Sequence, residues 1–186
     1  MQHQERQLVL DQLAASEARL LELVEGLTPD QWTFRPAEGR WSIAECVEHV
    51  VRVENRVLGI MGKKLAEGNP EPGKQAPARD AVVAQGVTDR TTRREAPEPV
   101  RPTGQWPGAD ELLAEFRGTR QRTTEFTATT QGDLRSYFQP HGAFGELDFY
   151  QWLLVLSLHG SRHAQQIEEI KAASGFPRPT ASPASA

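Results

Sequence analysis

The sequence predicts an all-α fold, a four-helix bundle formed by a single domain over residues 1–175. Four long segments carry apolar residues at helical spacing, and connectors rich in Pro and Gly separate them. No segment alternates convincingly enough to predict a β-strand. A chain of 186 residues can bury one sizeable core. Its 38% hydrophobic and 25% charged residues are typical of a globular protein.

Residues 3–25 predict the first amphipathic helix. Leu and Val recur there among Gln, Glu and Arg, and Gly26 supplies a C-terminal stop. Thr28 is expected to cap a short helical turn that begins at Pro29. Aromatic residues follow in the connector and are expected to cover the core: Trp32, Phe34 and Trp41.

The second helix is expected to begin after Ser42 and to run to about residue 65. Ser42-Ile43-Ala44-Glu45 has the form of a capping box, in which the Glu side chain reaches back to the cap. His49 lies beside or on the apolar stripe of this helix, so we expect it to face inward. The stripe consists of Ile43, Cys46, Val47, Val50, Val53, Val57 and Met61.

Residues 66–108 interrupt the helical pattern and form a long proline-rich insertion between the second and third helices. They hold seven of the thirteen prolines. We expect mostly irregular chain here, with a short helical turn at residues 82–87. A loop of this length is uncommon in a compact domain and is usually functional or partly disordered.

The third helix is expected over residues 109–131 and the fourth over residues 148–170. An aromatic, glycine-rich connector over residues 137–145 joins them. The Pro- and Ser-containing residues 176–186 predict a disordered tail.

The composition argues against several classes of partner. The net charge is -4, only four lysines occur and the arginines are scattered along the sequence, whereas nucleic-acid binding needs clustered Lys and Arg. The longest apolar run, Leu153–Leu156, is far too short to span a bilayer, and no signal peptide is visible. One cysteine excludes an internal disulfide and fits a reducing compartment. We therefore expect a cytoplasmic protein without a nucleic-acid or membrane partner.

Three histidines on two helices point to a metal site. His159 and His163 are four residues apart, so their side chains leave the same helical face about one turn apart. With His49 they would supply three nitrogen ligands and leave other positions to water or substrate, the pattern of catalytic rather than structural zinc. Imidazole also suits nickel and iron. The H-x3-H spacing alone is weak, and histidines packed in the core are the alternative.

Other residues near these histidines allow two interpretations each. Cys46 could be a ligand or a reactive thiol, although a buried cysteine is more often inert. His141 could reach a substrate, although a surface loop is the simpler interpretation. Three glutamates could support the histidines or form a solvated face: Glu45, Glu48 and Glu54.

Gly160 follows His159 where zinc proteases of the H-E-x-x-H type have their catalytic Glu. Protease chemistry of that type is therefore not expected. Gly160 and Ser161 are small, so a neighbouring helix or a ligand could come close at this point.

Two parts of the sequence resemble the DinB-like (DinB/YfiT) family. Its W-S-x-x-E-x-x-x-H segment, which opens the second helix, is similar to Trp41-Ser42-Ile43-Ala44-Glu45-Cys46-Val47-Glu48-His49. Its H-P-x-F-G-x-L…W-L…H-x-x-R-H-x-x-Q-I ending is similar to residues 141–147, 152–153 and 159–167. The sequence departs from this pattern at Gly142, where proline is usual, and in its long insertion.

The resemblance implies a four-helix bundle, often homodimeric, with nickel or zinc held by His49, His159 and His163. It also implies a metal-dependent thiol S-transferase or hydrolase that activates a thiol or water and acts on a small-molecule substrate. Characterised relatives include thiol-dependent S-transferases and a mycothiol-dependent isomerase, which makes a low-molecular-weight thiol a candidate cofactor. Two alternatives stay open: a non-catalytic metal-binding stress protein, and a helical dimerisation module with histidines packed as core.

Overall fold

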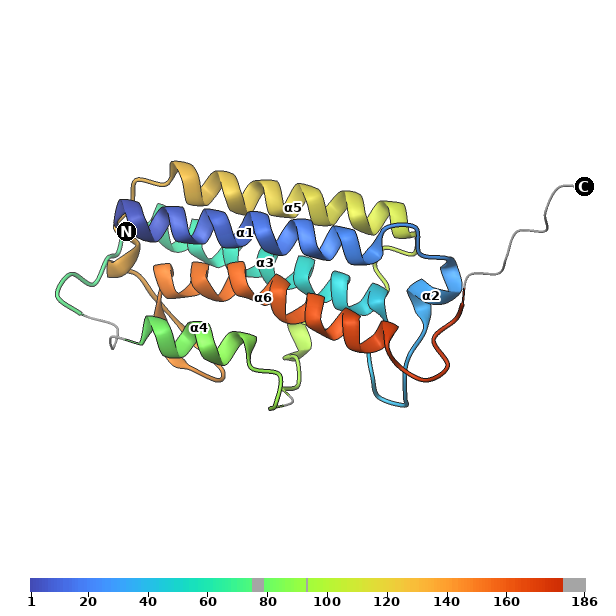
Figure 1. The fold of residues 1–186 in the computed structure, drawn as a ribbon. Coiled ribbons are helices and arrows are strands. Elements are labelled where there is room, and N and C mark those ends of the chain that lie inside the picture. Colours follow the sequence, from blue (N-terminus) through green and yellow to red (C-terminus); the bar gives the residue numbers. More distant parts are fainter. Residues whose placement is uncertain (75–78, 93, 179–186) are drawn as a thin grey trace, which may run out of the picture.

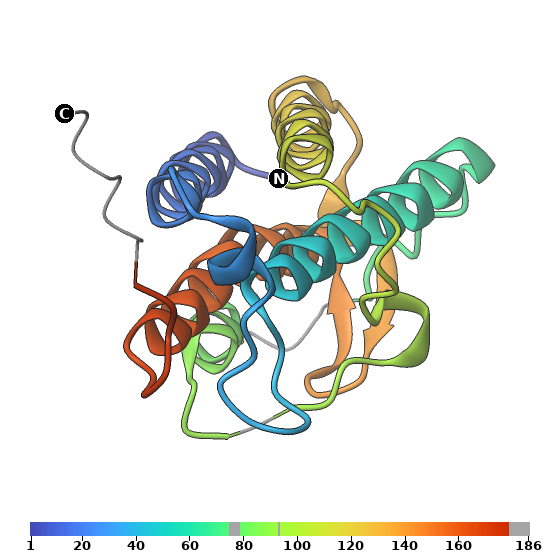
Figure 2. The same ribbon diagram turned by 90° about the vertical axis from the view of Figure 1, so that its right-hand side faces the viewer.

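The computed structural model describes residues 1–74, 79–92 and 94–178. The predicted long helices are present and lie side by side (Figures 1 and 2). They are α1 (His3–Val24), α3 (Ile43–Glu67), α5 (Ala109–Thr129) and α6 (Phe149–Lys171). Between them lie α2 (Pro29–Thr33), α4 (Asp80–Thr88), 3-10 turns at Glu98–Val100 and Leu134–Ser136, and strands β1 (Phe138–His141) and β2 (Gly145–Asp148).

The order of the helices around the bundle explains why a long connection is needed. α1 contacts α5 and α6, and α3 also contacts both of these helices. The colours in Figure 1 show that α1 and α6 run in one direction, while α3 and α5 run in the other. Because α3 and α5 are parallel neighbours, the chain must return along the bundle between them, and the 25 residues of α3 extend over about 37 Å.

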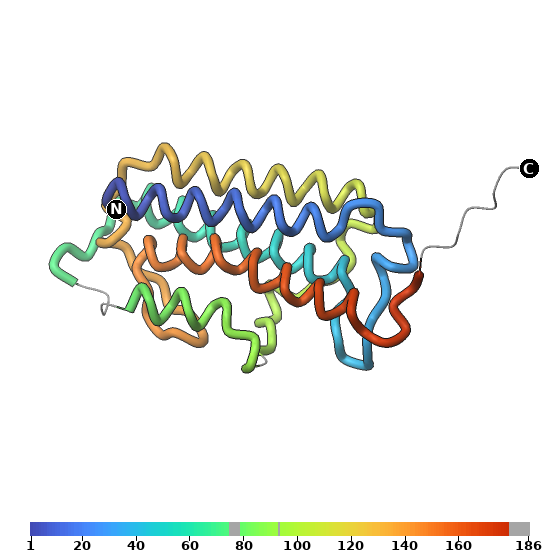
Figure 3. The backbone as a smooth tube through the Cα atoms, in the orientation of Figure 1, coloured from blue at the N-terminus to red at the C-terminus, as the bar shows by residue number. Residues whose placement is uncertain are grey.

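Residues 68–108 make this return, and we call them the crossover segment. Its described residues, 68–74, 79–92 and 94–108, follow the outer side of α3 and α6, away from α1 and α5 (Figures 2 and 3). The short helical turn expected at residues 82–87 is present as α4, which is a few residues longer than predicted. Its Val83 and Val87 pack against Val155 of α6 and Leu147 of β2. Burying an aliphatic side chain contributes about 1.5–3 kcal/mol. Two such side chains are enough to stabilise a short helix whose signal in the sequence is weak.

The residues that cap α3 and α6 fix where these helices begin. Ser42 and Asp148 each accept the backbone N–H three residues ahead and form capping boxes with Glu45 and Gln151. α3 ends at Gly68, which has a left-handed φ of 67°. The caps therefore set the positions along the bundle of the histidines that both helices carry.

The prediction of an all-α fold is wrong at residues 138–148, which form a β-hairpin. Phe138 pairs with Asp148, and His141 pairs with Gly145 across the turn. Pro140 lacks a backbone N–H and is tolerated because the sheet has two strands, each with a free edge. Proline and glycine in this stretch are typical of an irregular connector, so the sequence pattern does not predict the two strands.

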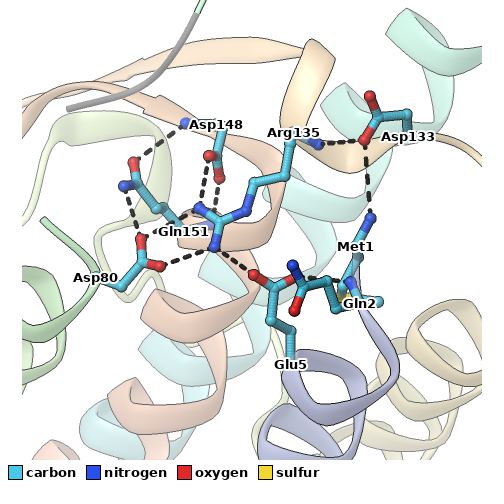
Figure 4. Close-up of polar contacts among 8 residues, drawn as sticks. All are labelled: Met1, Gln2, Glu5, Asp80, Asp133, Arg135, Asp148 and Gln151. Atoms are coloured by element: carbon cyan, nitrogen blue, oxygen red, sulfur yellow. Dashed lines mark hydrogen bonds and ion pairs between the residues drawn. The ribbon is translucent and has the colours of Figure 1, made fainter. Parts of the chain in front are cut away.

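Arg135 ties the hairpin end of the bundle together (Figure 4). Its Nη2 lies 2.5 Å from Glu5 of α1 and 2.7 Å from Asp80 of α4, and its Nη1 lies 2.9 Å from Asp148, the cap of α6. Burial opposes the charge on Arg135, but the hydrogen bonds that it donates to these carboxylates raise its pKa. The start of α4 is thus anchored to the helices of the bundle.

The chain after α6 begins by packing against the region of α2. The Phe176 ring contacts the Phe34 ring edge-on at 5.6 Å, and Gln31 donates a hydrogen bond to the Pro177 carbonyl over 2.8 Å. The rest of the predicted tail, residues 179–186, lies outside the described residues. In the part of the chain that is described, no helix has the length and apolar character needed to cross a membrane.

Candidate metal centre

Three imidazole rings meet between α3 and α6. The ring centroid of His49 lies 5.0 Å from that of His159 and 4.9 Å from that of His163. The two rings on α6 are 4.5 Å apart. One nitrogen of each ring lies within 4.8 Å of the other two. The three rings therefore converge on one point, which suits three ligands around one ion.

The crossover segment determines which nitrogen of His49 is free. His49 Nδ1 lies 2.7 Å from the carbonyl oxygen of Val100, in the first 3-10 turn. A carbonyl oxygen only accepts, so Nδ1 carries the proton and the lone pair is on Nε2. A backbone carbonyl in this position is typical of histidines that bind metal ions.

The ring nitrogens of His159 and His163 are incompletely paired within the protein. Their Nε2 atoms face each other at 3.1 Å. Their Nδ1 atoms are buried and lack hydrogen-bond partners among the described residues. A cation between the Nε2 atoms would use both lone pairs.

The surroundings keep all three imidazoles neutral, which is the form that ligates metal. Burial lowers the pKa of His49 to about 4. Burial also lowers the pKa of His159 and of His163 well below the ordinary value, and the neighbouring histidines add to this effect. No proton therefore has to leave these rings before a metal ion binds near neutral pH.

The three histidines line a cleft with a volume of about 1030 Å³. Its described walls come from residues 39–41, α3, the crossover segment, the hairpin and α6. Of these walls, the crossover segment and the hairpin lie on the outer side of α3 and α6 (Figure 2), whereas bundle proteins usually build such sites in the bundle core. The Trp41 ring covers one side of the centre, 4.8 Å from His49 and 6.1 Å from His163.

His141 lines the same cleft, so it is not an unrestrained loop residue. Its Nδ1 accepts the backbone N–H of Ala143 at 3.0 Å and of Phe144 at 3.3 Å. The proton of the neutral ring is therefore on Nε2. The ring also contacts Trp152, with centroids 4.9 Å apart, and burial lowers its pKa to about 4. His141 is thus a fixed, neutral hydrogen-bond donor.

Glu48 supports the site through the backbone of the crossover segment. Its carboxylate is 3% exposed and accepts the backbone N–H groups of Thr103 at 2.8 Å and of Gly104 at 2.9 Å. Interpreting Glu48 as part of a solvated face is therefore wrong. Glu45 has a different partner: it completes the cap of α3 and binds Arg35 at 2.8 Å.

Glu54 is also buried and does not belong to a solvated face. Its carboxylate lies 2.7 Å from the guanidinium of Arg120 on α5, and both side chains are 1% exposed. Thr123 donates a further hydrogen bond to Glu54 over 2.8 Å. The pair joins α3 to α5.

Gly160 allows α1 and α5 to come close to α6. A Cβ atom at this position would lie 3.1 Å from atoms of Ser16 and Arg120. The small residue after His159 therefore makes room for neighbouring helices, which is one of the two possibilities that the sequence left open. Cys46 is fully buried in the apolar core, and burial raises the pKa of its thiol, so it is inert packing.

Comparison with known families and curated proteins gives two matches. The family model described as the DinB superfamily matches residues 12–167. The uncharacterized protein YuaE of Bacillus subtilis (strain 168) is 26% identical over 148 residues, which cover 80% of this chain and 88% of YuaE.

The solved structures that share the fold include two four-helix bundle proteins. YfiT from Bacillus subtilis, described as a probable metal-dependent hydrolase with an unusual four-helix bundle topology, has a TM-score of 0.59 and 14% sequence identity. The alignment covers 95% of this chain and 91% of YfiT. The four-helix bundle protein TT2238 has a TM-score of 0.56 and 20% identity, over 88% of this chain and 98% of TT2238.

Proposed function

The chain belongs to the DinB superfamily, and we propose that it is a metal-dependent enzyme in which His49, His159 and His163 hold one divalent ion. The meeting of three neutral imidazoles in the wall of one cleft supports this proposal. Nickel and zinc are the candidate metals, because imidazole nitrogen suits both. Three protein ligands leave further positions for water or substrate, as in catalytic sites.

The proposed reaction is hydrolysis or thiol transfer on a small-molecule substrate. A bound divalent ion would supply Lewis-acid activation, which lowers the pKa of a coordinated water or thiol. The likeness to YfiT, described as a probable metal-dependent hydrolase, supports hydrolysis. In thiol transfer, the thiol would come from a low-molecular-weight cosubstrate, because the single cysteine of the chain is buried.

The residues of the cleft have distinct roles in this proposal. Val100 holds His49 in the tautomer that presents Nε2. His141 donates a hydrogen bond from its Nε2–H to an oxygen of the substrate and so helps to orient it. Trp41 shields the centre from water on one side.

Metal content tests the site. Protein purified without chelators is expected to contain about one nickel or zinc ion per chain, as the three-ligand site requires. The His159→Ala variant should lose this metal, whereas His3→Ala, at an exposed position, should keep it. Circular dichroism should show the same helix content in all three proteins. If the wild-type protein binds neither ion and His159→Ala changes nothing, a dimerisation module with histidines packed as core becomes the better interpretation.

Activity assays test catalysis separately. Metal-loaded protein is offered thiols with a panel of electrophiles, and simple esters and amides. Turnover that disappears in the His159→Ala variant supports an enzyme. Turnover of none of these by fully metallated protein would instead favour a non-catalytic metal-binding stress protein. The homodimer stays a prediction, which analytical ultracentrifugation can test.

A further inference from the structure

The cleft beside the three histidines is strongly cationic, although the protein as a whole is acidic. The described lining residues include only two carboxylates, Glu95 and Glu169, whereas the whole chain has a net charge of -4. The cations of the lining are all arginines: Arg40, Arg56, Arg90, Arg94, Arg101 and Arg162. They are scattered over the sequence, and the fold brings them to one concave surface.

The protein compensates only part of this positive charge. Glu169 lies 2.5 Å from Arg90 and 3.8 Å from Arg40, so one carboxylate serves two guanidinium groups. Arg162 donates to the backbone carbonyls of Val87 and Thr92, both at 3.2 Å, and these oxygens carry no formal charge. An excess of positive charge therefore remains in the cleft.

Two of the arginines are available to a ligand. Arg56 is exposed on α3 and has no hydrogen bond or ion pair with any described residue. The guanidinium of Arg94 lies over the Phe144 ring, 5.4 Å from its centroid, and makes no hydrogen bond or ion pair with any described residue. Both can bind an oxyanion through parallel N–H groups.

The rest of the lining is largely apolar. Aromatic rings are supplied by Trp41, Trp152 and Phe144, and aliphatic side chains by Val57, Ile60 and Val155. A ligand that fits this surface combines a charged group with an apolar or aromatic body.

We propose that the cleft selects a small organic anion, in which an apolar body carries a carboxylate or a phosphate ester held by Arg56 and Arg94. This inference rests on the proposed function only in placing the reacting group of the anion at the three histidines. Cationic side chains in a cleft with apolar walls focus the electrostatic potential and raise the local concentration of an anionic substrate. The arginines thus set the substrate class, and the histidines set the chemistry.

Binding to metal-free protein tests the proposal, because a metal ion would itself attract anions. The probes are N-acetylphenylalanine, its neutral methylamide, and benzyl phosphate, and the readout is the fluorescence of Trp41 and Trp152 in the cleft. We expect at least one anion to bind about tenfold more tightly than the methylamide, as charged hydrogen bonds allow. The tighter of the two anions identifies carboxylate or phosphate as the preferred group.

A double variant in the cleft and a control variant outside it locate the effect. Changing Arg56→Gln and Arg94→Gln together should remove the preference for the anion. Arg117→Gln should not, because Arg117 is exposed on α5 and does not line the cleft. Raising the salt concentration should weaken binding of the anion and leave the methylamide unaffected.

Two results would overturn the proposal: equal binding of anion and methylamide, or a preference that survives in the double variant. A protein that binds no metal but keeps its anion preference would instead contradict the proposed function alone. A metal-loaded, active protein without anion preference would contradict only the present inference.

Discussion

The carbonyl oxygen of Val100 accepts the Nδ1 proton of His49 over 2.7 Å and so connects the crossover segment to the candidate metal centre. Glu48, next to this histidine on α3, binds the backbone of Thr103 and Gly104 a few residues further along the same segment. The segment that returns the chain between two parallel helices therefore also orients a ligand. Substitutions that remove these contacts with the crossover segment should therefore lower the affinity for the metal.

Glu48→Gln is expected to weaken metal binding about tenfold while helix content stays unchanged, as loss of support behind a ligand does elsewhere. The amide has one acceptor oxygen instead of two, and its NH2 group would face backbone N–H groups. Chelator competition with zinc or nickel measures the affinity. Glu98→Gln, an exposed change in the same segment, is the control. Equal affinities of wild type and Glu48→Gln would exclude this anchoring role.

Gly160→Ala is expected to destabilise the protein by about 1–3 kcal/mol, because its Cβ would press on Ser16 and Arg120. His159 is the adjacent residue, so metal affinity should fall as well. Gly59→Ala on α3 is the matched control: no heavy atom lies within 4 Å of the Cβ it would add, and a helical Ala should stabilise by about 0.5–1 kcal/mol. Urea unfolding measures the change in the free energy of unfolding for both variants. Equal effects of the two substitutions would show that the close approach has no energetic role.

Glu54→Gln is expected to cost about 3–5 kcal/mol, because it leaves the buried guanidinium of Arg120 without a counter-charge. Glu115→Gln removes the partner of Arg122 in a more exposed pair on α5, which should cost less than about 1 kcal/mol. Thermal and urea unfolding of the two variants give the comparison. A small loss for Glu54→Gln would mean that water or another group reaches Arg120.

His141 is expected to make the protein acid-sensitive. Burial lowers its pKa from 6.5 to about 4, so between these pH values the unfolded chain binds a proton that the folded chain does not. Stability should therefore fall as pH drops from about 6.5 to about 4, by about 1–2 kcal/mol once solvent screening is allowed for. In metal-free protein, His141→Gln should show a smaller loss between pH 7 and pH 4.5 than wild type. His3→Gln should behave like wild type, and parallel curves for all three would refute the shift.

The sequence predicts the helices well where local signals are strong. The capping box at Ser42 and the end of the apolar stripe near residue 65 bound α3 almost where it is found. The spacing of His159 and His163 correctly places both on one face of α6. The hairpin escapes because proline and glycine within it mask the pairing of Phe138 with Asp148.

Contacts between distant segments explain what the sequence leaves open. The Val100 carbonyl is a backbone group, so the residue type at position 100 does not predict the hydrogen bond to His49. Glu48 and Glu54 look like ordinary helix-surface residues until the crossover segment and α5 cover them. Arg56 and Arg94 are scattered in the sequence and meet in one cleft only because the chain crosses over the outer face of α3 and α6.

Cys46 determines how the protein will behave in a solution of thiols and disulfides. A reactive protein thiol would exchange with such disulfides, and the attacking species would be its thiolate. Burial keeps the Cys46 sulfur out of contact with solvent, and its raised pKa keeps the thiol protonated. The native chain should therefore neither form mixed disulfides nor react with Ellman's reagent. Any thiol consumed in an assay will be the cosubstrate's own.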